Sequence, residues 1–170
     1  AGFAHVSCLA EQAKILYAEA EENNLGDKAM NERFSRWHAC SLCEQDYHGV
    51  VRCALGWACW KTYVGRQEAN WARRLSMTAL GNGLAIAKHH EDALSVQDAE
   101  LSMLRRLGAR EESILVTQGN LAGTYASLGR YEHASRMQRE VYSGQLKLQG
   151  EHRDTFIAAN NYAGPLIGLQ

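Results

Sequence analysis

A spacing of 41 residues, which occurs twice in the second half of the chain, is the feature that most limits the fold. The segments 80–82, 121–123 and 162–164 carry it, and each begins with a large apolar residue. A period of this length is typical of an array of supersecondary units, each of which can bury its apolar face only against its neighbours. Other positions share the spacing: Leu84, Tyr125 and Leu166; Ala93 and Ala134; Gln97 and Gln138; Leu107 and Leu148.

Each unit is predicted to be a helical hairpin, because apolar residues recur at helical spacing, stop at a break, and then recur in a second amphipathic stretch. Many alanines and leucines and a single proline favour helices, so the predicted fold class is all-α. We expect Leu80, Leu121 and Tyr162 to be buried at equivalent places. Gly108, Gly129 and Gly150 are suited to end helices. The predicted helices span about residues 67–88, 91–107, 112–128, 131–148 and 153–169.

The segments 120–134, 150–155 and 160–163 resemble the tetratricopeptide repeat, in the longer form found in kinesin light chains. The resemblance implies a solenoid of hairpins over residues 66–170 that binds protein or peptide partners. Pro165 lies inside a predicted first helix, and the last repeat stops at Gln170 without a second helix. The last repeat is therefore expected to be incomplete.

The same resemblance implies a peptide-binding groove, because its pattern places an asparagine before the first large apolar residue of a repeat. Asn120 and Asn161 match this position, whereas Ala79 does not. A carboxamide can pair with both the N–H and the C=O of an extended peptide, whatever the peptide's side chains are. Alternatively, these asparagines tie one hairpin to the next. Asn82 and Asn160 are secondary candidates for the groove.

Composition excludes several other classes of function. The formal net charge of -1, with signs interspersed, gives no field that attracts nucleic acid or an anionic bilayer. No apolar run reaches the ~20 residues that a membrane-spanning helix needs. The five cysteines are odd in number and fit a reducing, cytoplasmic location better than a disulfide scaffold. The N-terminus does not have the pattern of a signal peptide.

The first 65 residues do not keep the register of the repeats. They are predicted to form a separate module over residues 1–49 and a connecting helix over residues 50–65. Within them, helices are expected over about residues 9–23, 28–37 and 50–63.

Two pairs of zinc-type ligands lie in this module. His5 and Cys8, and Cys40 and Cys43, each stand three positions apart, a spacing that lets a pair grip zinc from one tight turn. Together with Trp37 and Tyr47, they resemble the second half of a RING-CH zinc finger, of the kind carried by membrane-associated ubiquitin ligases. The resemblance implies that the two pairs belong to two different zinc ions, each with two of its four ligands in this chain.

Other interpretations of these residues stay open. Cys40, Cys43, His48 and Cys53 have the spacing of a zinc knuckle, although Glu44 and Tyr47 stand where a knuckle normally has glycine. Each pair can also consist simply of packed side chains, and Cys53 and Cys59 are expected to be buried thiols.

The sequence thus predicts a protein-interaction scaffold with a zinc-binding, RING-CH-like module. The alternative is a ubiquitin ligase, in which the module binds a ubiquitin-conjugating enzyme and the repeats select the substrate. Ligases of this type use no catalytic side chains of their own, and no catalytic pairing of residues is evident in the sequence. No catalytic residue is therefore expected in either case.

Overall fold

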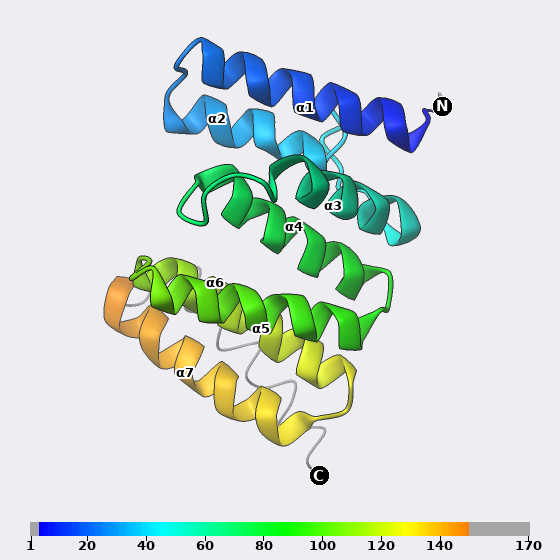
Figure 1. Ribbon diagram of the computed structural model, residues 1–170. Coiled ribbons are helices and arrows are strands. Elements are labelled where there is room, and N and C mark those ends of the chain that lie inside the picture. The colour runs from blue at the N-terminus through cyan, green and yellow to red at the C-terminus, as the bar shows by residue number, and fades with distance from the viewer. Residues whose placement is uncertain (1–3, 150–170) are drawn as a thin grey trace. The chain divides into compact units, whose positions relative to one another are not determined.

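The computed structural model describes residues 4–149, and all its regular elements are helices (Figure 1). An isolated antiparallel bridge between Ala39 and Asp46 is the one β-type pairing in this range. The all-α prediction is confirmed. In chain order, the helices are α1 (Val6–Glu22), α2 (Asp27–Phe34), η1 (Ser35–Trp37), α3 (Gly49–Tyr63), α4 (Trp71–Ile86), α5 (His90–Arg106), α6 (Glu111–Ser127) and α7 (Tyr131–Gln149).

Helix ends follow the expected local chemistry with two exceptions. Gly108 and Gly129 have φ values of 61° and 71°, so glycine supplies the left-handed residue after α5 and α6. After α4, however, Lys88 takes this conformation with φ of 67°. Helix α4 also begins later than predicted, at Trp71, because the side chain of Asn70 caps it by accepting a hydrogen bond from the Arg73 N–H at 3.2 Å.

The chain forms two compact units that divide between His89 and His90. This grouping follows contacts between helices and does not decide the domain limits near residues 49 and 65, which stay predictions. The helix expected at residues 153–169 lies outside the described residues, as does Tyr162.

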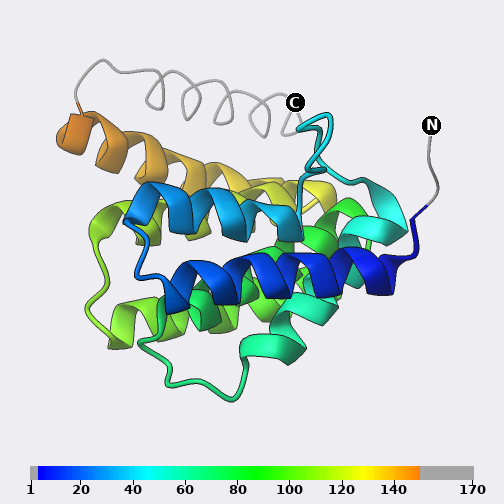
Figure 2. The same cartoon turned by 90° about the horizontal axis from the view of Figure 1, so that it is seen from above.

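An aromatic cluster forms the core of the first unit. Within α1 and α2, which lie side by side (Figures 1 and 2), Tyr17 packs edge-on against Phe34 with ring centres 5.5 Å apart. Tyr63 from α3 lies 5.5 Å from Tyr17, and Trp71 stacks on Tyr17 at 5.9 Å. Burial raises the pKa of Tyr17 to about 12, and the nearby Glu21 carboxylate adds to the rise. Rings brought from four helices therefore fix the arrangement of this unit.

Arg66 closes the cluster from the loop after α3. Its guanidinium lies 4.8 Å from the centre of the Tyr63 ring and donates two hydrogen bonds to Glu21, at 2.5 and 2.8 Å. The main-chain oxygen of Arg66 in turn accepts a hydrogen bond from Arg73 at 2.5 Å. Arg66 thus connects the α3 to α4 loop to α1 through its side chain and to α4 through its main chain.

Helices α3 and α4 approach each other closely through two glycines. A Cβ atom added at Gly56 would lie 2.7 Å from the main-chain oxygen of Ala79, and one added at Gly83 would lie 2.9 Å from that of Arg52. Both distances are shorter than real Cβ contacts, so only glycine permits this approach.

In the second unit, α6 packs against both α5 and α7. Thr124 on α6 donates a buried hydrogen bond of 2.7 Å to the side chain of Gln97 on α5. Because both polar groups are paired inside the unit, this bond specifies how α5 and α6 align.

Several pairs of residues that lie 41 positions apart also have similar exposed fractions. Leu80 and Leu121 are both buried, as predicted, and equivalent alanines and glutamines share full burial. Equivalent leucines that are exposed also agree, at 38% and 42%. In these pairs, the same place in a hairpin is therefore buried, or exposed, in both repeats. The exposed fractions are 0% for Ala93 and Ala134, 1% and 3% for Gln97 and Gln138, and 38% and 42% for Leu107 and Leu148.

Replacing Gly56 or Gly83 by alanine should destabilise the first unit by about 1–3 kcal/mol, because the new methyl group meets helix backbone that cannot move aside. Thermal unfolding followed by circular dichroism measures the effect. The control is Gly123→Ala in α6, where a Cβ meets nothing within 4 Å and helix propensity favours alanine. Equal effects of all three substitutions would contradict the close approach of α3 and α4.

Candidate functional site: an open face of α6 and a two-cysteine turn

Helix α6 has one face that neither α5 nor α7 covers. Leu115, Leu121 and Ala122 are buried, whereas residues at helical spacing on another side are exposed or half-buried. Val116 is 55% exposed at one end of this side, and two glycines leave the backbone bare in its middle, with nothing within 4 Å of an added Cβ. We call this set the α6 face: Val116, Gly119, Asn120, Gly123 and Ser127.

Asn120 lies in the middle of the α6 face and is half-buried. Its main-chain oxygen accepts a hydrogen bond of 3.2 Å from Thr124, but within residues 4–149 its carboxamide forms no hydrogen bond. The next hairpin was predicted beyond residue 149, outside the described residues, so the alternative role of tying one hairpin to the next also stays open. Its predicted role in peptide binding stays a prediction.

The positions of the other candidate asparagines do not test their predicted roles in peptide binding. Asn82 lies on α4 in the first unit and is half-buried. Asn160 and Asn161 lie outside the described residues, so their predicted roles stay open. The sequence pattern singled out asparagines but missed Val116, Gly119 and Gly123, whose spacing of three and four residues on α6 was the available signal.

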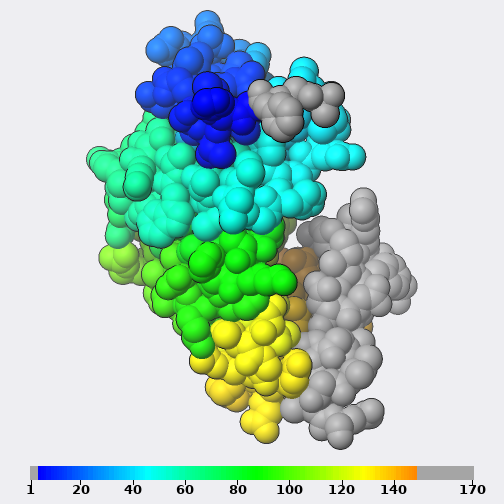
Figure 3. Space-filling view, turned by 90° about the vertical axis from the view of Figure 1, so that its right-hand side faces the viewer, coloured from blue at the N-terminus to red at the C-terminus, as the bar shows by residue number. Residues whose placement is uncertain are grey.

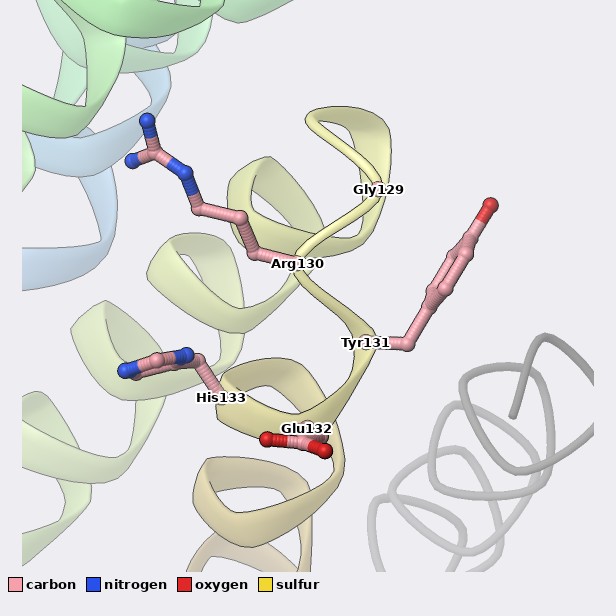
Figure 4. A pocket seen from close by; sticks show the side chains of 5 residues that line it. All are labelled: Gly129, Arg130, Tyr131, Glu132 and His133. Atoms are coloured by element: carbon pink, nitrogen blue, oxygen red, sulfur yellow. The ribbon is translucent and has the colours of Figure 1, made fainter.

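A shallow hollow of about 310 Å³ lies at the turn between α6 and α7 (Figure 4). Arg130 and Tyr131 point away from one another there, and Arg130 donates a hydrogen bond of 2.7 Å to Glu91. His133 stacks on the ring of Tyr125 at 5.4 Å. Because these side chains are engaged elsewhere and do not converge, the hollow has no arrangement suited to catalysis.

Cys40 and Cys43 lie on a tight turn that projects from the first unit (cyan in Figures 2 and 3). The Cys40 N–H donates to the Gln45 oxygen at 2.9 Å, and the Glu44 N–H donates to the Cys40 oxygen at 3.0 Å. Arg36 adds a bond of 3.1 Å to the same Cys40 oxygen. Main-chain bonds on both arms of the turn therefore fix its shape, which the sequence did not predict.

The turn also favours a charged sulfur. The Leu42 N–H donates to Cys40 Sγ at 3.4 Å, and the N–H groups of Leu42 and Cys43 lower the pKa of the Cys40 thiol. Cys43 is exposed, and Cys40 is half-exposed. Such a thiol is prepared to act as a metal ligand, which must be deprotonated.

No three metal-binding side chains come together among residues 4–149. His5 and Cys8 are exposed at the start of α1, and they do not complete a four-ligand site with Cys40 and Cys43 there. The zinc expectation for these four residues therefore stays a prediction.

The described structure gives the zinc-knuckle alternative no support, since His48 precedes α3, Cys53 lies within that helix, and the four side chains form no cluster among the described residues. Cys59 is fully buried, as expected, and Cys53 is half-buried. None of the five cysteines forms a disulfide.

Comparisons with known proteins bear on the fold. No protein-family model matches the chain, and no curated protein matches it. A crystal structure from Podosopora anserina, described as a kinesin light chain with nearly identical TPR-like repeats, matches with a TM-score of 0.59. Its sequence is 18% identical, and the match covers 98% of this chain and 69% of that chain. The chain has a TPR-like helical-repeat fold.

A variant of the same Podosopora protein matches equally, with a TM-score of 0.58, 18% identity, and coverage of 99% of this chain and 69% of that one. Both matches extend over nearly the whole chain, so the TPR-like likeness includes helices before residue 66. Within residues 4–149, no helix is both long enough and apolar enough to cross a membrane.

The alkylation rate of Cys40 should reach half its maximum at a lower pH in the folded chain than in the urea-unfolded chain, because the turn stabilises the thiolate. Iodoacetamide labelling at a series of pH values, resolved by peptide mass spectrometry, measures this rate. Since the folded pKa is the lower one, the thiolate stabilises the turn above the unfolded pKa, and this contribution disappears as the pH falls. The same half-maximal pH in both states would contradict the geometry of the turn.

Proposed function

We propose that the chain is a protein-interaction scaffold that binds an extended segment of a partner protein along the α6 face. The observation that carries this proposal is the half-buried Asn120 carboxamide, which has no hydrogen bond within the described chain and stands between two bare glycines. A TPR-like fold is consistent with this role, because stacked hairpins present helix faces to partners.

The chemistry of the α6 face suits a peptide backbone. The Asn120 side chain can donate one hydrogen bond and accept another, and Gly119 and Gly123 let a peptide approach the helix closely. Val116 offers an apolar contact at one end. None of the five residues is charged, although the exposed Glu112 lies one turn before Val116, so the face suits an extended backbone with an apolar side chain.

A role of Asn82, Asn160 and Asn161 in peptide binding is a proposal of its own, separate from the α6 face. A cytoplasmic location remains a proposal of the same kind. The RING-CH module, ligase activity and a ubiquitin-conjugating enzyme as partner gain no support from the described residues and stay predictions.

A second role, zinc binding at Cys40 and Cys43, is supported by the two-cysteine turn. It presents two thiols from one rigid turn, with main-chain N–H groups directed at Cys40 Sγ, as a zinc ligand pair requires. We propose that these two residues are zinc ligands, and that His5 and Cys8 belong to a different site.

Asn120→Ala should weaken binding of a peptide selected from a random library by about 5- to 160-fold, since two hydrogen bonds contribute about 0.5–1.5 kcal/mol each. Gly123→Leu should abolish binding, because its side chain fills the α6 face, and its Cβ meets no atom within 4 Å. Calorimetric titration gives the dissociation constants.

The matched control is Asn31→Ala, which removes an exposed asparagine on α2, and it should leave binding unchanged. Circular dichroism checks that each variant is folded. Unchanged affinity in both Asn120→Ala and Gly123→Leu would refute the α6 face as the binding site.

A further inference from the structure

We propose that one zinc ion joins two copies of this chain, bound by Cys40 and Cys43 of each copy. This inference rests on the proposal that these two cysteines are zinc ligands. It adds where the remaining ligands come from, and therefore what kind of partner the two-cysteine turn recognises: a second, identical turn.

Ligand counting leads to this arrangement. Structural zinc is almost always bound by four ligands in a tetrahedron, and four cysteine thiolates are one of its common sets. The described chain offers two thiols at the turn, and no third histidine, cysteine or carboxylate is grouped with them. Two turns supply four sulfurs, so a pair of copies satisfies the metal where one copy does not.

The turn is exposed enough to meet its own copy. Cys43 is exposed and Cys40 is half-exposed, at the end of a segment that projects from the helices of the first unit (Figure 2). Leu42, between them, is 93% exposed, the largest exposure of any large apolar side chain described. A two-fold axis through the metal would bring the two Leu42 side chains near each other, so association would also bury apolar surface.

Hydrogen bonds hold the turn at both ends and at Cys40. Its ends are bridged where the Tyr47 N–H donates to the His38 oxygen at 2.8 Å, and His38 pairs with Asp46 at 3.1 Å. Arg36 holds the Cys40 oxygen at 3.1 Å. Two sulfurs that are already oriented lose little conformational freedom on binding, which favours a shared metal over two incomplete sites.

Charged side chains near the site both favour and oppose the association of two copies around zinc. Four thiolates and Zn²⁺ leave two negative charges, which the Arg36 guanidinium of each copy would offset. Glu44 is exposed on the turn and opposes the association, whereas Asp46 is paired with His38 and lies 4.0 Å from Arg52. Because the partly buried Arg36 is fixed beside Cys40, its attraction acts where the charge develops.

Zinc titration of the reduced, metal-free chain, followed by sedimentation and metal analysis, tests the proposal. Half an equivalent of zinc per chain should double the mass, and a chelator should return it to that of one chain. Cobalt substitution should give the absorption of a site with four thiolates. Cys40→Ser and Cys43→Ser should each abolish zinc-dependent dimers, whereas Cys53→Ser should not.

The outcomes separate this inference from the proposal beneath it. One zinc per monomer that depends on Cys40 and Cys43 would overturn the shared site but keep these residues as zinc ligands. Loss of that zinc in Cys8→Ser would point to a site within one chain and would also overturn the inference. No zinc binding would overturn both proposals, and dimers that form equally without zinc would overturn the shared site.

Discussion

Close packing of helices against small residues is the constraint on which the rest of the structure depends. Gly56 and Gly83 let α3 and α4 approach until an added methyl group would touch backbone, and Ala93 and Ala134 are fully buried at equivalent places in the second unit. Dispersion contacts and apolar burial gain most where helix axes are close, so these positions determine which faces meet. Within residues 4–149, the α6 face is one that these contacts leave uncovered.

The first unit reaches the same helical architecture by other means. Its α1 and α2 helices lack the 41-residue register, yet they are held by aromatic rings around Tyr17 and by Arg66, which bonds Glu21 from 45 positions further along the chain. A partly buried, two-pronged pair of this kind adds direction to a core that is otherwise held by apolar contact. The 41-residue period does not extend to these helices, although the match to a TPR-like structure covers 98% of the chain.

Structural features that depend on residues close together in the sequence were predicted better than features that depend on contacts between separate segments. Helix periodicity and the glycines after α5 and α6 act locally, so helix type and most ends were predicted correctly. The capping by Asn70 and the left-handed Lys88 were missed, because either residue can occupy many other conformations. The shape of the two-cysteine turn could not be predicted, since it depends on bonds between its two arms and on Arg36.

In the candidate site too, some residues could be identified from their sequence position and others only from the packing of the helices. Asn120 was found because a resemblance fixed its position in a repeat, whereas the openness of Gly119 and Gly123 depends on which sides α5 and α7 cover. The cysteine spacing indicated a pair of ligands, but only the structure showed a rigid, projecting turn with two donors rather than four.

We propose that this scaffold binds its partner at the α6 face. Amide NMR shift mapping with a bound peptide distinguishes this site from other surfaces. The account predicts that the largest shifts fall on the main-chain amides of Gly119, Asn120 and Gly123, with little change on the outward side of α7. Shifts concentrated at the turn between α6 and α7, or spread over α1 and α2, with the α6 amides unmoved, would contradict it.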